Sequence, residues 1–416
     1  MIAAAALLLA MARPAPAAEP RTLAWEDCVA LASAQNPDLK SASFAQQSGR
    51  SNYLGSYNGV LPNLSLFNSY GDSNLAGPGT SHWQAGLATS MNLFSAGQIA
   101  NIRSASATAD RATAQLRQAS TDLRQTLRGA FLSLLFAQEN LAVSQGILAL
   151  RTRGAEMVTL RYDSGRESKG NMMRANAQRD QAEEELKQAA REVRTAQRTL
   201  GRYLGYEEFQ AFSATGTLAG DPPPDLPAEF ETLLARRPDV AAENAVVAVA
   251  EAGLFSARSP LFPSLTASYS RNVSGTGEFP TGSLGWTALG TLSLPIFGGG
   301  PTATYFSVTS AKQTLEKTHQ DLRVTRGNAL VDIENSWSAY AQDGAQARVA
   351  AELLDSARQR NDEADVRYAS GLLIYDNWEI IASDRISQER QALQSRLSAA
   401  TSEAGWDHAS GRGLTE

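Results

Sequence analysis

The sequence is poor in the residues that form covalent cross-links and metal sites. Its 416 residues include one cysteine, Cys28, and three histidines, His82, His319 and His408. A single cysteine excludes an internal disulfide, a cysteine-rich zinc site and a cysteine-ligated iron–sulfur cluster. No histidine has a second potential ligand at the spacing that zinc sites use. The sequence therefore predicts no bound metal.

Positive charge and long apolar runs are also scarce. Lys and Arg number 37 against 43 Asp and Glu, a formal charge of −6, which gives no electrostatic reason to expect nucleic-acid binding. Mean hydropathy is −0.27. Beyond the N-terminus no stretch long enough to span a bilayer as a helix is both uncharged and strongly apolar, which excludes a bundle of transmembrane helices.

Catalytic motifs are missing as well. The chain has no nucleophile elbow, phosphate-binding loop or dinucleotide fingerprint, and Gly298–Gly300 lacks the Lys-Ser/Thr step that completes a phosphate-binding loop. Asp and Glu are scattered over helical stretches, where a solvated surface is the default. The sequence thus predicts a protein that is not an enzyme and has no cofactor.

The N-terminus has the pattern of a signal peptide over residues 1–17. Met1–Ala12 is an apolar run too short to span a bilayer, and Ala15-Pro16-Ala17 places small residues at −3 and −1 of a cleavage site. No Lys or Arg precedes the run, and a disordered Ala-rich tail is the alternative. Cys28 lacks the small apolar residues that precede a lipidated cysteine, so we interpret it as a packed thiol. An export signal with one free cysteine suggests a bacterial envelope protein.

The chain is a tandem duplication with a repeat of about 200 residues. Five pairs of segments match in the same order, with an offset that drifts from 201 to 206. The clearest pairs are Asn36–Leu39 with Arg237–Val240, Leu61–Leu64 with Phe262–Leu265, and Arg161–Gly165 with Arg367–Gly371. We assign residues 18–215 to the first repeat and 228–416 to the second. A connector over 216–227 contains three consecutive prolines, which cannot continue a helix.

Each repeat encodes helices, then a hairpin, then two long helices. Both opening stretches, about 23–57 and 228–257, contain a Pro-Asp step that should begin a new helix. Alternation with a period of two follows at about 64–94 and 265–297 and is typical of membrane-barrel strands, although a soluble hairpin alternates too. From 97 to 203 and from 301 to 409 the sequence is helical. A break at each Tyr-x-Ser-Gly turn makes two antiparallel helices.

The first helix after each hairpin is unusually long. About 60 residues at 1.5 Å each make a rod of about 90 Å, apt for crossing a periplasm. Leu127, Leu134, Leu141 and Leu148 recur every seven residues, with Leu123 and Phe131 on the same stripe. Such a narrow seam fits helices packed side by side with one face in water. The core of an ordinary helical bundle would show the same pattern.

Four strands are too few to close a membrane barrel. An open sheet edge is not tolerated in lipid, so several chains must share the barrel. Two chains would supply eight strands with a filled interior, whereas three would supply twelve and leave a lumen. The sequence therefore predicts a homo-oligomer.

These features together resemble the TolC family of outer-membrane channel proteins. The resemblance covers nearly the whole mature chain and adds Leu294–Gly300 to the repeated motifs given above. It implies a mainly α-helical homotrimer with a shared twelve-strand β-barrel in the lipid of the cell outer membrane and a periplasmic α-barrel. It further implies that the helical tips meet a periplasmic adaptor bound to an inner-membrane transporter.

The resemblance also implies roles for the two tip turns. Adaptor contacts are expected at Arg161, Tyr162, Gly165, Arg367, Tyr368 and Gly371. Candidate aperture or selectivity residues are Arg166, Lys169, Asp376, Asn377 and Glu379. We expect Asp376 or Glu379 to select cations or to pair with Arg166 or Lys169, with a solvated turn as the alternative. Asn377 stands where relatives often have aspartate. The two tyrosines are expected to be packing residues first, and bulky replacements of Gly165 and Gly371 should impair docking or opening.

The function predicted from the sequence is a passive outer-membrane exit duct of a tripartite efflux system, carrying small molecules or ions. The outer-membrane component of a type I protein-secretion system would have the same fold. A periplasmic coiled-coil adaptor is an alternative of another class. It predicts one central helical hairpin flanked by small β-domains, whereas this chain has a strand pair in each of two repeats.

Overall fold

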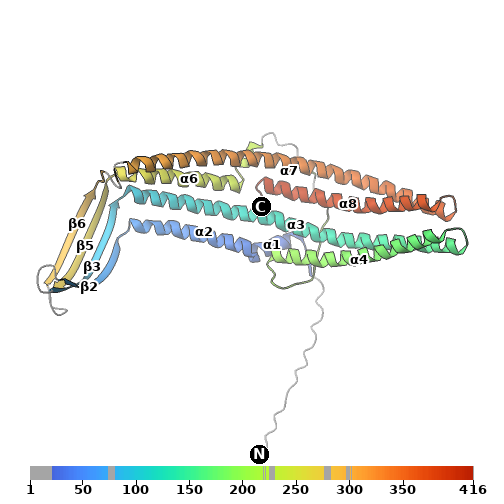
Figure 1. Cartoon of the computed structure of the whole chain (residues 1–416), viewed down its shortest axis with the longest axis horizontal. Coiled ribbons are helices and arrows are strands. Elements are labelled where there is room, and N and C mark those ends of the chain that lie inside the picture. Colours follow the sequence, from blue (N-terminus) through green and yellow to red (C-terminus); the bar gives the residue numbers. More distant parts are fainter. Residues whose placement is uncertain are drawn as a thin grey trace, which may run out of the picture.

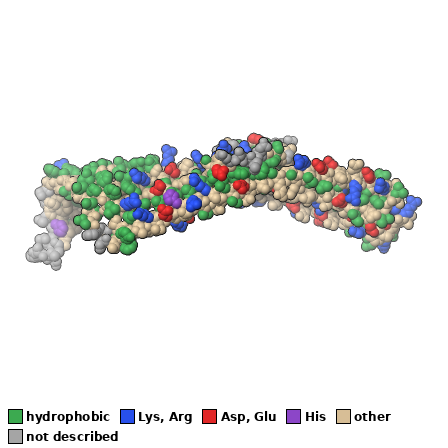
Figure 2. Space-filling model, turned by 90° about the horizontal axis from the view of Figure 1, so that it is seen from above, with side chains coloured by type: hydrophobic (Ala, Val, Ile, Leu, Met, Phe, Trp, Pro, Cys, Tyr) green, Lys and Arg blue, Asp and Glu red, His purple; other side chains and the backbone are tan. Residues whose placement is uncertain are grey.

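The computed structural model describes residues 21–73, 80–218, 220, 222–223, 230–275, 283–296, 300 and 302–415. The predicted signal peptide and half of the predicted connector lie outside these residues. The molecule is elongated, with a β-sheet at one end and helical hairpins running to the other (Figure 1). Hydrophobic side chains gather toward the end that carries the sheet, while charged side chains concentrate farther along (Figure 2).

The two repeats contain matching elements in the same order. The first has β1 (Arg21–Leu23), α1 (Trp25–Gln35), α2 (Pro37–Ser56), β2 (Asn63–Ser73), β3 (Thr80–Phe94), α3 (Ala96–Asp163) and α4 (Lys169–Leu204). The first repeat ends with β4 (Phe212–Ala214), and the second has α5 (Glu231–Leu234), α6 (Pro238–Arg258), β5 (Ser264–Gly275), β6 (Ser283–Ser293), α7 (Ala303–Ala369) and α8 (Tyr375–Ala409). Short 3₁₀ turns at Tyr57–Gly59 and Ser259–Leu261 follow α2 and α6.

Local capping explains where several helices begin. Pro37 and Pro238 occupy the first turns of α2 and α6, as the Pro-Asp steps predict. Asn36 caps α2 by accepting a hydrogen bond from the Leu39 N–H at 2.9 Å. At the strand-to-helix corner, the Ser95 hydroxyl accepts from the Gln98 N–H at 3.3 Å and so caps α3.

The four long strands form one antiparallel sheet in the order β2-β3-β5-β6. The hairpins predicted from the alternating pattern are confirmed. The pairing of β3 with β5 joins the hairpin of the first repeat to that of the second. Within the described chain β2 and β6 each pair on one side only, so both are edge strands. The unpaired N–H and C=O groups of two open edges would have no hydrogen-bond partners in a membrane, so the sheet needs further strands there.

The helices form four columns, and two columns are built from two helices end to end. Figure 1 shows α2 followed by α4, then α3, then α6 followed by α8, then α7. The longest helices, α3 with 68 residues and α7 with 67, span nearly the whole helical part. At 1.5 Å per residue each is about 100 Å long.

The largest apolar core lies near the middle of the molecule. Leu127, Phe131 and Leu134 of α3 are fully buried there, which confirms this part of the heptad seam. Leu141 and Leu148 are only half-buried. Cys28 packs in the same core with no exposed surface. Burial, aided by Asp27 and Glu26, raises the pKa of its thiol to about 12, as expected of a packed cysteine.

One segment of this core differs from the prediction. The helix predicted from about Leu23 begins later, because residues Arg21–Leu23 form β1 and pair in parallel with β4. Leu23 and Phe212 from these strands are both buried. Strands of three residues are too short to show an alternating pattern. The two strands also lie on either side of the long helices α3 and α4 in the sequence, so periodicity does not detect their pairing.

One described helical stretch, Pro238–Leu261, is long and apolar enough to cross a membrane by length and composition. Its most apolar window has a mean hydropathy of 1.4, and 22 % of that window is buried. The helix lies between α3 and α7 in the bundle (Figure 1). One such helix is weak evidence for a membrane span and does not make a bundle of transmembrane helices.

Candidate functional site at the helical tips

Both helical hairpins turn with the same backbone geometry, which explains the repeated Arg-Tyr-x-Ser-Gly motif. Gly165 and Gly371 have φ of +71° and +78°, in the left-handed region. The Gly165 N–H donates to the Tyr162 carbonyl at 2.9 Å and the Arg166 N–H to the Arg161 carbonyl at 2.8 Å. The second turn repeats both bonds at the corresponding positions. This is a Schellman cap, in which glycine adopts the left-handed conformation without steric cost.

An aromatic cluster lies behind the second turn. Tyr368 is fully buried, and its ring stacks on Trp378 with the centroids 4.8 Å apart. The Trp378 indole N–H donates to Asp365 at 2.6 Å, and Tyr375 lies at the edge of the same stack. Val158 and Ala175 from the other hairpin complete the cluster. The side chains of both repeats therefore pack together at the tip.

Tyr368 is the centre of a polar latch between the two hairpins. Its hydroxyl donates to Glu167 Oε2 at 2.8 Å. The Arg161 guanidinium stacks over the Tyr368 ring at 4.5 Å and donates to the Tyr368 carbonyl. We call Arg161, Glu167 and Tyr368 the tyrosine latch. It joins the turn after α3 to the end of α7.

The tyrosine latch shifts the pKa of both Glu167 and Tyr368. Burial would raise the pKa of Glu167, but hydrogen bonds from Asn171, the Ser168 N–H and Tyr368 outweigh it and lower the pKa. Burial, followed by the hydrogen bond to Glu167, raises the pKa of Tyr368 well above its usual value. At neutral pH the glutamate is therefore an ionised acceptor and the tyrosine a neutral donor.

Glu379 forms a second latch deeper in the hairpins. It is 4 % exposed and accepts from Arg151 at 2.9 Å and from the Gln178 side-chain amide at 2.7 Å. The Ser383 hydroxyl donates to the same carboxylate at 2.7 Å. We call this group the glutamate latch, because it ties α8 to α3 and α4. The expected pairing of Glu379 with Arg166 or Lys169 is wrong, since Glu379 faces inward one turn beyond the loop and pairs with Arg151.

The other sequence-predicted residues lie on the surface of the tip. Arg166, Lys169, Arg367, Asp376 and Asn377 are exposed or nearly so, and Tyr162 is half-buried. Within the described residues none of the four charged side chains, Arg166, Lys169, Arg367 and Asp376, has an ion-pair partner. The structure thus separates the predicted set into buried latch residues and residues that face solvent.

The tip also exposes apolar side chains that motif reasoning missed. These are Leu160 (71 % exposed), Val366 (67 %), Leu372 (79 %) and Ile374 (65 %). Beside them lies a shallow cavity of about 440 Å³, lined by Leu160, Arg161, Arg166 and Gly371 among others. Apolar exposure around basic groups is typical of a protein-binding surface.

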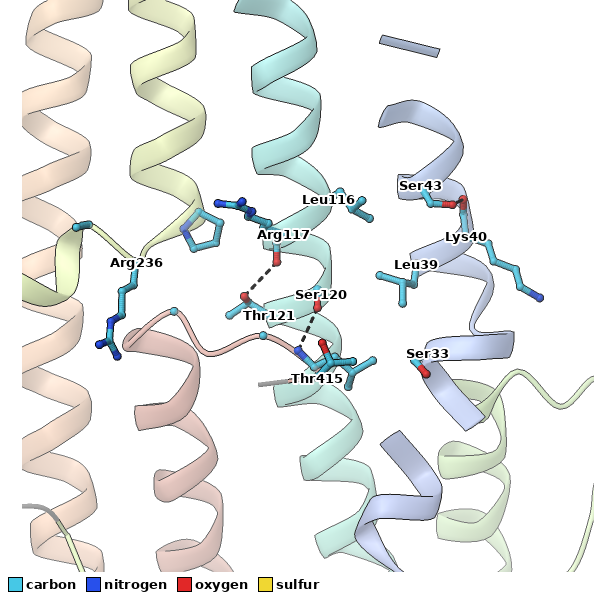
Figure 3. Close-up of a pocket in the computed structure, with 15 residues that line it drawn as sticks. Ser33, Leu39, Lys40, Ser43, Leu116, Arg117, Ser120, Thr121, Arg236 and Thr415 are labelled. Carbon is cyan, nitrogen blue, oxygen red and sulfur yellow. Dashed lines mark hydrogen bonds between the residues drawn. The ribbon is translucent and has the colours of Figure 1, made fainter. Parts of the chain in front are cut away.

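A larger cavity of about 870 Å³ lies near the middle of the molecule (Figure 3). Its lining contains Lys40, Arg117 and Arg236 but no Asp or Glu among the described residues. In Figure 3 these three side chains point in different directions, and Lys40 turns away from α3. The Leu414 N–H donates to the Ser120 hydroxyl at 3.0 Å, which fixes the C-terminal segment against α3. The cavity is thus a basic groove without a converging ligand set.

In the described part of the chain, no group of three or more His, Cys, Asp and Glu side chains could hold a metal ion. The tip residues that sequence reasoning missed include Arg151, Glu167 and Trp378. Trp378 follows a buried tyrosine at helical spacing, and its partners Asp365 and Tyr368 lie in the same repeat. Glu167 precedes the N-cap of α4, but its partner Tyr368 lies in the other repeat, as does Glu379, the partner of Arg151. Those contacts join one repeat to the other, so no local pattern reports them.

Comparison with known proteins supports this architecture. The family model described as outer membrane efflux protein matches residues 29–206 and 230–409, one segment in each repeat. The chain is 30 % identical over 169 residues to the cobalt-zinc-cadmium resistance protein CzcC of Cupriavidus metallidurans, 41 % of this chain. It is 27 % identical over 251 residues to the outer membrane protein OprJ of Pseudomonas aeruginosa, 58 % of this chain.

These alignments span 40 % of CzcC and 51 % of OprJ, about half the length of these relatives. The likeness of fold extends further. A crystal structure of CusC superposes with a TM-score of 0.85 at 18 % identity, over 94 % of this chain and 92 % of that one. At this identity the match concerns the fold alone, and it confirms the mainly helical, tandemly repeated architecture.

Proposed function

Because this chain belongs to the outer membrane efflux protein family, we propose that it is the outer-membrane exit duct of a tripartite efflux system. In this proposal three chains form a passive channel that carries small molecules or ions from a periplasmic adaptor and an inner-membrane transporter to the exterior. No step of this function requires catalysis by the chain.

One observation carries the proposal. The four-stranded sheet has two open edges in the described chain, and it continues into helices about 100 Å long. Neither edge can face lipid, because its unpaired N–H and C=O groups would have no partner there. Pairing β6 of one chain with β2 of the next removes every edge. Three chains then supply twelve strands, enough to enclose a lumen.

The helical end supports an adaptor contact. Leu160, Val366, Leu372 and Ile374 stand exposed around the tip turns. Burying each in an interface would contribute about 1.5–3 kcal/mol of apolar transfer free energy. We propose that an adaptor covers them and also contacts Arg161, Tyr162, Gly165, Arg367 and Gly371, while the buried Tyr368 holds the second turn in position from behind.

The same end supports an aperture. In a trimer the surface residues Arg166, Lys169, Asp376 and Asn377 from three chains surround the pore mouth. The glutamate latch sets the position of α8 behind them. We propose that these residues tune passage of charged cargo, and that the two latches hold the resting state.

Metal ions are one cargo class that we propose. CzcC is named as a cobalt-zinc-cadmium resistance protein, and it is 30 % identical to this chain over 169 residues. A duct contacts its cargo weakly, so this proposal depends on the relative and not on a binding site. Deleting the gene and measuring growth on cobalt, zinc and cadmium tests it. Unchanged tolerance would contradict the metal cargo but not the duct.

The duct itself is tested by the mass of the membrane particle. The protein is extracted from outer-membrane fractions in mild detergent, and its mass is measured by light scattering corrected for bound detergent. We expect the mass of three chains, each of 44.4 kDa before signal-peptide removal. A soluble monomer would contradict the shared barrel and with it the duct.

A further inference from the structure

The sheet has one apolar face and one polar face, and cross-strand register identifies both. Residues paired across antiparallel strands point to the same face. Leu66, Leu87, Arg271 and Trp286 form one such row across β2, β3, β5 and β6. The face containing this row also carries Leu64, Tyr70, Trp83, Ala85, Met91, Leu265, Ala267, Tyr269, Val273, Leu284, Ala288 and Leu292. We call it the apolar face.

The opposite face is mostly small and polar. It carries Ser65, Ser69, Gln84, Ser90, Thr266, Ser268, Ser270, Asn272, Thr287 and Thr291. In a membrane barrel such a face lines the lumen, and the apolar face meets lipid.

Arg271 is therefore a cation on the lipid-facing side. The described strands of the sheet contain two charged residues, Asp72 and Arg271, and both lie on the apolar face. Arg271 is exposed, and its direct neighbours in the row are Leu87 and Trp286. Among the residues that the structure describes, its side chain has neither an ion-pair nor a hydrogen-bond partner.

The position of Arg271 along the strand places it near the outer membrane surface. The strands β2 and β5 end at Ser73 and Gly275, at the end of the sheet away from the helices, which is the outer end of a barrel whose helices enter the periplasm. Arg271 lies four residues before Gly275, the end of β5. On a strand tilted by about 40° this is about 10 Å below the Tyr70–Trp83 pair, within reach of the headgroups for a long side chain.

No carboxylate of the described sheet can neutralise Arg271. Asp72 pairs with Ser81, six residues from Leu87 along β3, which is about 20 Å away. The strand β5 is also internal, between β3 and β6, so both direct neighbours come from the same chain. A strand from a second chain can pair only beyond β6 or β2. The counter-charge for Arg271 must therefore come from outside these strands.

We infer that Arg271 binds the phosphate group of a lipid in the outer leaflet of the membrane. A planar guanidinium matches phosphate with two parallel hydrogen bonds, and such charged hydrogen bonds are strong outside bulk water. Trp286 and Tyr269, which are 70 % and 39 % exposed, are neighbours of Arg271 on the apolar face, and their amphipathic rings suit the interfacial zone. This inference depends on the proposed membrane barrel, because the apolar face would otherwise meet no lipid.

The test measures lipid binding to the purified, detergent-solubilised oligomer by native mass spectrometry. The probes are lipid A with two phosphates and the same lipid after enzymatic removal of phosphate. We expect the wild-type protein to prefer the phosphorylated probe and Arg271→Gln to bind it about tenfold more weakly. Arg271→Lys should retain part of the preference, because it keeps the charge but loses the planar fork.

Two control variants separate the alternatives. Arg326→Gln removes an arginine from α7, outside the sheet, and should leave lipid binding unchanged. Glu278→Gln alters a carboxylate in the sequence between β5 and β6. Thermal stability without lipid is measured for Arg271→Gln in the wild-type protein and in the Glu278→Gln variant. If Arg271→Gln lowers the stability of the wild type but not that of Glu278→Gln, a protein carboxylate is the partner of Arg271 and the inference is wrong.

Equal binding of the phosphorylated probe to wild type and Arg271→Gln would also overturn the inference. The mass of the particle separates this failure from failure of the duct. If the protein is a trimer from the outer membrane and the substitution does not change lipid binding, only the lipid site is contradicted. A soluble monomer would contradict both proposals.

Discussion

At the scale of single residues, the buried carboxylate of Glu379 is the centre of the glutamate latch. It accepts hydrogen bonds from Arg151, Gln178 and Ser383, so each of its oxygens has a partner. Asp376 lies three residues earlier on the same helix but is exposed. The two residues provide a matched comparison of a buried and a solvated acid.

We expect Glu379→Gln to lower the free energy of unfolding by about 3 kcal/mol, because it leaves the Arg151 charge buried without its counter-ion. Asp376→Asn should change it by less than about 0.5 kcal/mol. Thermal unfolding of the purified oligomer, followed by loss of helical circular dichroism, measures both. Equal unfolding temperatures for the two variants would show that the glutamate latch does not stabilise the tip.

The tyrosine latch should respond to acid through Glu167. The folded state lowers the pKa of this carboxyl below its ordinary value of 4.5, so its contribution to stability is present above that value. The contribution is lost as the pH falls through the lowered pKa of the folded state. Spin labels on cysteines introduced at Asp163 and Ala369 report the distance between the hairpin ends.

We expect that distance to be constant near neutral pH and to lengthen only as the pH falls below 4.5, the ordinary pKa of this carboxyl, and through its lowered pKa in the folded state. Glu167→Gln should remove the acid-dependent step, because the amide cannot be titrated. A step that persists unchanged in Glu167→Gln would assign the response to another carboxylate.

The residues of the tip are predictable from the sequence, but their partners are not. The Tyr-x-Ser-Gly repeats locate both turns, and the packing role predicted for Tyr368 agrees with its burial. Because Glu379 follows the second turn closely in the sequence, it is predicted to lie at the aperture. Its side chain instead points inward to Arg151, which lies 228 residues away. Helical spacing alone does not reveal which face of α8 meets the other repeat.

At the scale of elements, the two glycine caps determine where α3 and α7 end. Gly165 and Gly371 have positive φ, and a side chain at either position would strain the backbone even though the space around both is open. We expect Gly165→Ala and Gly371→Ala each to destabilise the tip by about 1 kcal/mol.

Gly146 is the matched control for these caps. It lies within α3, has no neighbouring atom within 4 Å of an added Cβ, and does not have positive φ. Gly146→Ala should stabilise the helix by about 0.5–1 kcal/mol. Thermal unfolding distinguishes the signs, and a stabilising Gly371→Ala would contradict the role of the cap.

The junction between the two hairpins depends on a close backbone approach at Gly86. An added Cβ there would lie 2.4 Å from the Arg271 carbonyl oxygen and 2.7 Å from the Asn272 Cα. We expect Gly86→Ala to disrupt the pairing of β3 with β5 and to reduce the yield of folded oligomer severely. Gly285→Ala on β6, with nothing within 4 Å, is the control.

Heat-resistant oligomer on gel electrophoresis and mass by light scattering measure the outcome. Normal assembly of Gly86→Ala would show that the strands can separate to accept a methyl group.

The repeat made the four long strands and four long helices predictable, because each signal occurred twice. The small sheet of β1 and β4 was not predictable, since its pairing depends on contacts across the whole first repeat.

At the scale of the whole molecule, the two latches lie at the end opposite the four-stranded sheet. The tyrosine latch and the glutamate latch both join the α7–α8 hairpin to the α3–α4 hairpin. Weakening them should allow the hairpins to part without disturbing the sheet. If the tips form the narrowest part of the assembled duct, the latches control its conductance.

We expect Tyr368→Phe combined with Glu379→Gln to raise single-channel conductance in planar bilayers at neutral pH. The double variant removes the hydroxyl that bonds Glu167 and the negative charge that holds Arg151, while retaining the ring stack and the shape of both side chains. Because both latches act on one hairpin, each single variant should raise conductance less than the pair does. Asp376→Asn controls for loss of a charge at the pore mouth. An unchanged conductance in a double variant of normal mass would place the constriction elsewhere in the duct.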